Sequence, residues 1–454
     1  MRVTTQTARD SLQTNTVAPW VRRGGPAVAT IALVTYVTAY AHWPTLRMQV
    51  DAMVYRFAAE RLLAGLDLYS TGLTGKPGEL LFIYPPFAAI CALPLALLDS
   101  SVVHLLWLLG VVATLTYAVV RMLKSTGMQV GEGLFSLVAL LVGVIAWLEP
   151  IRLTAELGQI NLVLLALVVA DLSPCASRGW ASSLRGECPQ GIKKSKWTGI
   201  GVGLAAGIKL TPALFIVYLL VTRRIRAALL ATATFAATVG IGFAVAPADS
   251  ATFWLHGRFD DVNRISHDPL ANTSVRGLLL RLNWQPTLAA IAAIAVAAIA
   301  VLVAAFAYRH GQGVLAVAVV GMASAAASPF SWSHHWVWFA PLVVHLGHRA
   351  YVLRGRVAAT VMWLLCALVG GWFVFVAGDS PQAGILSLRP GGEWNEILPG
   401  AYVLVFLAVL FGTAVWLWSL PDCGHLTRLS THDLDDIERA HAERDSRVAL
   451  AQQD

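Results

Sequence analysis

The chain has 454 residues, of which 57% are apolar and only 13% are charged, and its formal net charge is +7. Soluble domains are about 45–50% apolar and about 25% charged, so this composition excludes an ordinary soluble enzyme, a disordered chain and a nucleic-acid-binding protein. Several apolar runs approach the roughly 20 residues that cross a ~30 Å hydrocarbon layer. The sequence therefore predicts an all-α polytopic membrane protein.

Run length and flanking turn residues divide the chain into three parts. We expect a cytoplasmic N-terminal tail at 1–25, a membrane domain at 26–420, and an acidic cytoplasmic tail at 421–454 that is either disordered or helical. Arg22 and Arg23 precede the first apolar run, and basic residues stay on the cytoplasmic side. The expected crossings are 26–43, 82–98, 102–123, 134–148, 160–172, 198–221, 228–246, 287–308, 313–328, 336–348, 357–377 and 399–420.

Two long loops, 44–81 and 247–286, fall on the outer face in this topology. Within the first loop, residues 48–64 place apolar side chains at helical spacing and gather charged side chains on another face. This pattern is typical of an amphipathic helix that lies on a membrane surface.

The number of crossings depends on the middle of the chain. A twelve-crossing arrangement puts the basic loop 173–197 on the outer side, against the preference of basic residues for the cytoplasm. If 198–221 is instead broken or re-entrant around Lys209, that loop returns to the cytoplasm and 10 or 11 crossings remain. Both arrangements stay open.

Asp51 is a lone carboxylate among apolar neighbours in the first outer loop. An ionised group in a membrane costs roughly 2.5–3.5 kcal/mol, so each one suggests a function. Burial raises the pKa of a carboxylate, which suits a base that takes a proton from a hydroxyl near neutral pH. The structural alternatives are a helix N-cap or an ion pair with Arg47 or Arg56.

His334 and His335 stand between two apolar runs, beside Trp332 and Trp336. Adjacent side chains on a helix point about 100° apart, so the two histidines cannot easily bind one metal ion. We expect one histidine to face a catalytic cavity. The tryptophans are either an interfacial aromatic belt or a stacking wall for a sugar ring.

The five cysteines form no CxxC pair, so we expect no metal site, although metal dependence stays open.

Lys209 and Arg152 are the candidate cations for an anionic substrate group. The glycines before Lys209 do not have the spacing of a nucleotide phosphate loop. A lysine beside a Thr-Pro break can still hold a phosphate as a point charge. Gln159 and Asn161 can donate and accept hydrogen bonds at once, as sugar hydroxyls require, or can join neighbouring helices.

Five segments, in this order, resemble one family: VDAMVY, YPPFAAI, WLEPIRLTAELGQINLVLL, GIKLTPALFIVYLL and SPFSWSHHWVW. They are similar to the mycobacterial-type, polyprenyl-phosphate-mannose-dependent α-1,2-mannosyltransferases of the GT-C class of membrane glycosyltransferases. The resemblance covers roughly residues 26–420. It implies a GT-C fold with about 10–12 transmembrane helices and long outer-face loops.

The resemblance also implies a reaction. Mannose would pass from polyprenyl-phosphate-mannose to a mannose 2-hydroxyl of a phosphatidylinositol mannoside, lipomannan or lipoarabinomannan, with inversion, on the outer face of the plasma membrane. No cofactor would be needed, and the partners would be the lipid-linked donor, the glycolipid acceptor and membrane lipids. Asp51 matches the catalytic aspartate of a D-x-x-V-Y pattern, His334 and His335 match a His-His-Trp block, and Tyr84 joins the residues expected to bind substrate.

Two other functions fit part of the pattern. A related arabinofuranosyltransferase that uses polyprenyl-phosphate-arabinose would share the architecture, since sugar identity depends on pocket shape. A proton-coupled transporter or flippase would also place charged residues in the membrane. That class predicts a charge relay across the bilayer and internal repeats, and the sequence shows no repeat.

Overall fold

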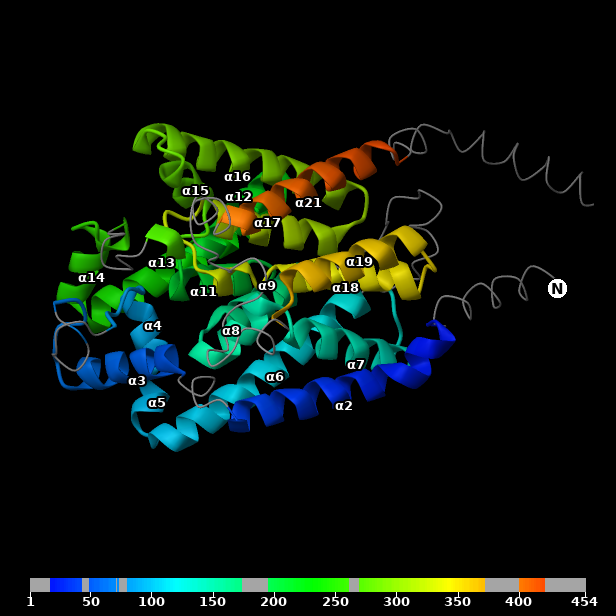
Figure 1. Ribbon diagram of the computed structural model, residues 1–454. Coiled ribbons are helices and arrows are strands. Elements are labelled where there is room, and N and C mark those ends of the chain that lie inside the picture. The colour runs from blue at the N-terminus through cyan, green and yellow to red at the C-terminus, as the bar shows by residue number, and fades with distance from the viewer. Residues whose placement is uncertain are drawn as a thin grey trace, which may run out of the picture.

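The computed structural model shows a bundle of helices, with no sheet among the residues that it describes (Figure 1). Over the residues that it describes there are α-helices, short 3-10 helices and one isolated bridge between Leu148 and Gly370, which confirms the all-α class. The predicted tail 421–454 and most of the tail 1–25 lie outside the described residues. These are 17–42, 49–70, 72, 80–173, 195–260, 269–371 and 400–420.

The first half of the chain supplies the helices that surround the site described below. In chain order they are α2 (Pro19–His42), α3 (Val50–Leu63), α4 (Pro86–Cys91), α5 (Leu93–Ala96), α6 (Ser100–Ser125), α7 (Glu132–Ala146), α8 (Glu149–Leu157), α9 (Asn161–Leu172), α11 (Ile200–Ile208), the 3-10 helix η2 (Thr211–Ala213) and α12 (Leu214–Val221).

The second half packs against the first and closes the bundle. Its elements are α13 (Ile225–Val245), α14 (Pro247–Trp254), η3 (Arg258–Asp260), η5 (Pro269–Ala271), α15 (Val275–Arg281), α16 (Pro286–Arg309), α17 (Gly313–Ala327), η6 (Ser333–Trp336), α18 (Phe339–Tyr351), α19 (Arg356–Val369) and α21 (Ala401–Trp418).

Four of the described helices, α6, α13, α16 and α21, are long and apolar enough to cross a membrane. The pair α8 and α9, bent by 119°, adds a fifth if it forms one span, and four shorter apolar helices accompany them. Large apolar side chains remain exposed on these helices, for example Leu105 on α6 and Ile294 on α16. Lipid tails are the natural neighbours of such side chains, and the chain is a multi-pass membrane protein. The total of 10 to 12 crossings stays a prediction.

The structure breaks two segments that the sequence offers as crossings. Segment 82–98 holds only α4 and α5, of 6 and 4 residues, and at ~1.5 Å per residue these do not span the hydrocarbon layer. Segment 198–221 is broken, as one of the two arrangements predicted. Helix α11 ends at Ile208, Lys209 is extended with φ −150° and ψ 130°, and Pro212 begins the next turn. The residue after α11 therefore projects its side chain from a helix end.

Figure 1 places α3, α4 and α14 at one end of the bundle. The start of α2 and the end of α21 lie toward the opposite end. The helix predicted within 48–64 is confirmed as α3, and it packs against α4 and α5. Its location on a membrane surface stays a prediction. Between the two ends of the bundle, α8 contacts both α3 and η6, and this junction carries the site.

Candidate functional site

Asp51 lies in the first turn of α3, with a partly exposed side chain. The N-cap of α3 is Gln49, whose side chain makes no capping hydrogen bond, so Asp51 is not the cap residue. Arg56 pairs with Glu60, at 2.9 Å between Nη2 and Oε1, rather than with Asp51. The other proposed partner, Arg47, lies outside the described residues. The N-cap and the ion pair with Arg56 are thus removed as explanations of Asp51.

The surroundings of Asp51 bring its pKa close to neutrality. Burial of the carboxyl group raises the pKa from 3.8 to about 6, because the charged form loses water. A hydrogen bond from the Gln159 side chain and the positive charge of Lys209 act in the opposite direction, but they are weaker. The carboxylate is therefore mostly ionised at neutral pH and still basic enough to take up a proton.

A buried network of aromatic hydroxyls holds Gln159 beside Asp51. The Tyr55 hydroxyl donates to Oε1 of Gln159 at 3.2 Å, and Nε2 of Gln159 donates to the Tyr84 hydroxyl at 3.1 Å. The two tyrosine rings lie 5.0 Å apart, and Tyr55 stacks on Trp107. The sequence assigned Gln159 and Tyr84 to the site. Tyr55 is the tyrosine of the D-x-x-V-Y pattern, one turn after Asp51, and it was not among the predicted site residues.

Gly158 explains how α3 comes so close to the turn between α8 and α9. It has φ +71°, a conformation that favours glycine. A Cβ atom at this position would lie 2.7 Å from Cβ of Ala52 and 3.0 Å from its backbone nitrogen. The backbone N–H of Gln49 also donates to the Glu156 carbonyl at 2.8 Å. The first turn of α3, with Asp51, is thus fixed against the residue that precedes Gln159.

Lys209 lies at the break after α11, beside Asn161 and the Tyr84 ring, and its side chain is buried. Nζ donates to Oδ1 of Asn161 at 3.0 Å and lies 3.0 Å from Nε2 of His335. It also lies 5.4 Å from the centroid of the Tyr84 ring. An ammonium group has three N–H donors, and these two polar contacts account for two of them. The attraction between Lys209 and Asp51 places a cation and a carboxylate in one site.

The two histidines differ in their contacts. His335, on η6, is partly exposed, and burial together with the charge of Lys209 lowers its pKa well below the usual value. It is therefore neutral, with Nε2 facing the ammonium group. His334 is buried and its ring lies 4.8 Å from that of His335, while its backbone carbonyl accepts from Asn161 at 2.9 Å. Of the pair, only His335 contacts Lys209 through its side chain.

Arg152 is not among the contacts of Lys209. Its guanidinium group pairs with Glu156 one turn further along α8, and both side chains are buried. Its Nε atom lies next to Gly371, where a Cβ atom would approach to 2.6 Å. Two of its nitrogens, Nε and Nη2, make no hydrogen bond in the described part of the chain. The role of Arg152 as a second anion-binding group stays a prediction. Its guanidinium group lies on α8 beside Glu156, not beside Lys209.

The tryptophans also separate into two roles. Trp332 is partly exposed and its ring stacks over His334, with centroids 6.2 Å apart. Trp336 is fully buried, donates from Nε1 to the Thr273 hydroxyl at 3.0 Å, and stacks on Tyr402. A fully buried ring has no face left for a sugar. The structure therefore places Trp336 in the core, where we had predicted a substrate contact.

The assembled group contains one carboxylate that can take up a proton and one ammonium group that can stabilise a developing negative charge. Neutral donors and acceptors surround both, from Gln159, Asn161 and the tyrosine hydroxyls. Among the described residues no group of three or more His, Cys, Asp or Glu side chains has the geometry of a metal site. This combination suits a displacement in which a hydroxyl group loses its proton and an anion departs.

Comparison with known proteins identifies the family. Residues 82–329 match glycosyltransferase family 87. The chain belongs to glycosyltransferase family 87. It is an enzyme, and the family resemblance inferred from the sequence motifs is confirmed. The match contains Tyr84, Gln159, Asn161 and Lys209, whereas Asp51 and both histidines lie beyond its ends.

Curated relatives extend the similarity over most of this family 87 glycosyltransferase. It is 33% identical over 410 residues, 86% of this chain and 91% of the relative, to a polyprenol-phosphate-mannose-dependent alpha-(1-2)-phosphatidylinositol pentamannoside mannosyltransferase of Mycolicibacterium smegmatis. The protein of the same name from Mycobacterium tuberculosis is 32% identical, over 84% of this chain and 86% of the relative. A phosphatidylinositol mannoside mannosyltransferase of M. tuberculosis is 30% identical, over 73% and 76%.

Proposed function

We propose that this glycosyltransferase moves a mannosyl group from polyprenyl-phosphate-mannose to a mannose 2-hydroxyl of a phosphatidylinositol mannoside, forming an α-1,2 linkage. The names of the relatives support both the lipid-linked donor and the class of acceptor. They also favour mannose over the arabinose alternative. The observation that carries the proposal is that Asp51, whose pKa is raised to about 6, and the ammonium group of Lys209 lie on either side of the hydrogen-bonded Gln159 and Tyr84 side chains.

The reaction is a single displacement at the anomeric carbon of the donor. The acceptor oxygen forms a bond to that carbon as the bond to the phosphate oxygen breaks, and the electron pair leaves with the phosphate. The hydroxyl proton passes to the carboxylate of Asp51, which acts as the general base. A β-linked donor then gives an α-linked product, so the configuration inverts. Asp51 is suited to this role because its side chain is partly exposed to an arriving substrate.

Lys209 has the complementary role on the leaving side. As the glycosidic bond breaks, negative charge grows on the phosphate, and a fixed ammonium group stabilises that charge without reorganising. Asn161 and His335 hold Nζ from two directions, at 3.0 Å each. Because His335 is neutral, it orients the ammonium group and does not compete with it for the anion. Phosphate is already a good leaving group, so the proposal needs no strong general acid and no cofactor.

The substrates would meet the site from the membrane. The donor is lipid-borne and arrives laterally, and the four spanning helices provide the surrounding surface. We place the site on the outer face of the plasma membrane, because Asp51 follows the crossing that the sequence predicts at 26–43, and Arg22 and Arg23 precede that crossing. Basic residues at the start of a first spanning helix keep that end in the cytoplasm. The end that leads to Asp51 then faces outward.

A transfer assay in membranes tests the proposal. Membranes containing the wild-type chain receive radiolabelled polyprenyl-phosphate-mannose and a phosphatidylinositol mannoside, and the labelled lipid product is separated and its linkage determined. Asp51→Asn is the decisive variant, since it keeps the size of the side chain and removes the base. Glu60→Gln is the matched control, because it removes a carboxylate from the same helix at an ion pair with Arg56.

We expect Asp51→Asn to lower the rate at least about 100-fold at equal protein level, the usual contribution of a general base, and Glu60→Gln to leave it within about twofold. Full activity in Asp51→Asn would show that another group is the base, and His335→Ala would then be the next variant. Transfer from the arabinosyl donor in place of the mannosyl donor would show that the sugar is wrong while the architecture is right.

A further inference from the structure

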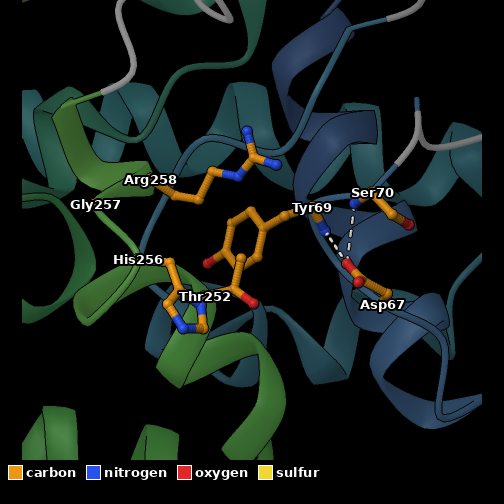
Figure 2. Close-up of a pocket in the computed structure, with 7 residues that line it drawn as sticks. All are labelled: Asp67, Tyr69, Ser70, Thr252, His256, Gly257 and Arg258. Carbon is orange, nitrogen blue, oxygen red and sulfur yellow. Dashed lines mark hydrogen bonds between the residues drawn. The ribbon is translucent and has the colours of Figure 1, made fainter.

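A polar pocket lies beyond the C-terminal end of α3, outside the group of side chains around Asp51. It has a volume of about 540 Å³, within the ~300–1,000 Å³ range of small-molecule sites. One wall is the chain that follows α3, with Asp67, Tyr69 and Ser70. The other wall comes from α14 and the turn after it, with Thr252, His256 and Arg258. Figure 2 shows these two segments facing each other across the pocket.

Local hydrogen bonds fix the first wall in place. Oδ1 of Asp67 accepts from the backbone N–H groups of Tyr69 and Ser70, at 2.6 and 2.9 Å (Figure 2). The Asp249 carboxylate of α14 accepts from the backbone N–H of Leu68 at 2.9 Å, which ties the two walls together. Beneath the pocket the Tyr69 ring stacks on Phe253, with centroids 5.8 Å apart. The lining is thus held by both segments rather than by one loose loop.

The lining has the chemistry of a carbohydrate site. It offers one carboxylate, one guanidinium group, one imidazole ring and the hydroxyls of Ser70 and Thr252. Sugar hydroxyls both donate and accept, so neighbouring hydroxyls pair well with a carboxylate on one side and a guanidinium group on the other. The charges of Asp67 and Arg258 balance, which fits a neutral polyhydroxyl ring better than a phosphate group. The side chains of both residues are exposed and accessible to such a ring.

The pocket is joined to the candidate active site through Tyr69. Its hydroxyl donates to the backbone carbonyl of Tyr84 at 2.6 Å, and the Tyr84 side chain is part of the group around Asp51. From Asp51 to the end of α3 at Leu63 the helix rises about 18 Å, at ~1.5 Å per residue. Several sugar units in a row cover the length of this helix, so an acceptor with several mannoses extends from Asp51 past the end of α3. One oligosaccharide could therefore occupy both places at once.

We propose that this pocket binds the carbohydrate of the acceptor glycolipid, at sugar units remote from the hydroxyl that is mannosylated. The inference rests on the proposed function and adds a site that selects longer acceptors. Asp67 and Arg258 are the two charged contacts. A short acceptor that carries only the attacked mannose reaches Asp51 and leaves the pocket empty.

The test compares two acceptors with one enzyme. One is an alkyl α-mannoside with a single mannose, and the other is a phosphatidylinositol mannoside with several mannoses; the donor is the same in both assays. The variants are Asp67→Asn, which keeps an oxygen for the turn, and Arg258→Ala on the opposite wall. Glu60→Gln is again the control, because it removes a carboxylate on α3 outside the pocket.

For each pocket variant we expect KM for the long acceptor to rise about tenfold, the effect of losing one hydrogen bond to a charged group, with kcat unchanged. KM for the alkyl mannoside and for the donor should stay within about twofold of wild type. Unchanged KM for the long acceptor in both variants would overturn the inference, as would an equal rise for both acceptors. Wild-type enzyme that transfers mannose to neither acceptor would instead overturn the proposed function.

Discussion

The ammonium nitrogen of Lys209 lies 3.0 Å from Nε2 of His335, although 126 positions separate the two residues in the chain. Lys209 stands at the break after α11 and His335 on η6, so the contact joins the two halves of the bundle. A lysine ammonium has no acceptor, hence the histidine nitrogen facing it must accept. The other ring nitrogen, Nδ1, lies 3.3 Å from the backbone nitrogen of Trp332 and 3.4 Å from the Ser331 hydroxyl, so both ring nitrogens of His335 have partners.

The pH dependence of the reaction should report the carboxyl group of Asp51. Because its pKa is raised to about 6, the base is protonated below that pH and ionised above it. We expect kcat/KM to rise with pH through about 6, with a slope of one on a logarithmic scale below that value, and to level off near pH 7. Rates measured with the short acceptor between pH 4.5 and 8 check this. A profile that is flat across this range contradicts the assignment of Asp51 as the base.

Lys209 should influence both the rate and the position of that pH limb. Its positive charge lowers the pKa of Asp51, so Lys209→Met should move the limb to higher pH as well as lower kcat/KM at least about 100-fold. Lys209→Arg keeps the charge and should leave the limb near pH 6, whatever it does to the rate. An unmoved limb in Lys209→Met would show that the two groups are not coupled. Both variants are compared at equal amounts of folded protein.

The local pattern of the chain is enough to predict several parts of this site. Apolar spacing gives the helix that carries Asp51. Pro212 gives the break, because proline has no N–H to donate to the Ile208 carbonyl four residues earlier and its ring clashes with that carbonyl, so α11 cannot continue. Motif order supplies the rest of the group, including Gln159 and His335. These features depend on neighbours in the sequence, and the structure confirms the helix and the break.

Three other features were not predicted, and only the first of them depends on partners far away in the chain. Trp336 lies only four residues after Trp332 in the same aromatic stretch, yet it is buried because it donates a hydrogen bond to Thr273 and stacks on Tyr402. Arg152 was grouped with Lys209 by charge, but the turn spacing of α8 pairs it with Glu156. Segment 82–98 is as apolar as a true crossing, and only its breaks show that it is too short to be one.

Removing the charge of Asp51 should stabilise the folded enzyme at neutral pH. A carboxyl group whose pKa is raised on folding contributes stability at low pH, and that contribution is lost as the pH rises through the folded value of about 6. Asp51→Asn should therefore melt at a higher temperature than wild type at pH 7.5 and at a similar temperature at pH 4.5. Thermal unfolding in detergent measures both. A lower melting temperature at pH 7.5 would mean that Asp51 is kept for structure.

Gly158→Ala should displace Asp51 from Gln159 without replacing any polar residue of the site. The new Cβ would meet Ala52 at 2.7 Å, and the residue would also have to keep φ +71°. The first turn of α3 should then move away from Gln159, so we expect the rate to fall at least about tenfold because catalytic groups tolerate little displacement. The assay is the same transfer measurement, made on protein that is shown to be folded.

Two variants separate the contact from the backbone strain. Gly65→Ala places alanine at φ +65° with no atom within 4 Å, so it costs roughly 1 kcal/mol of stability and should leave the rate within about twofold. The double variant Gly158→Ala with Ala52→Gly removes the side-chain atom in the way, although the Ala52 backbone nitrogen still lies 3.0 Å from the new Cβ, and should recover part of the lost rate. Equal losses in Gly65→Ala and Gly158→Ala would show that the contact between α3 and the turn before Gln159 does not position Asp51.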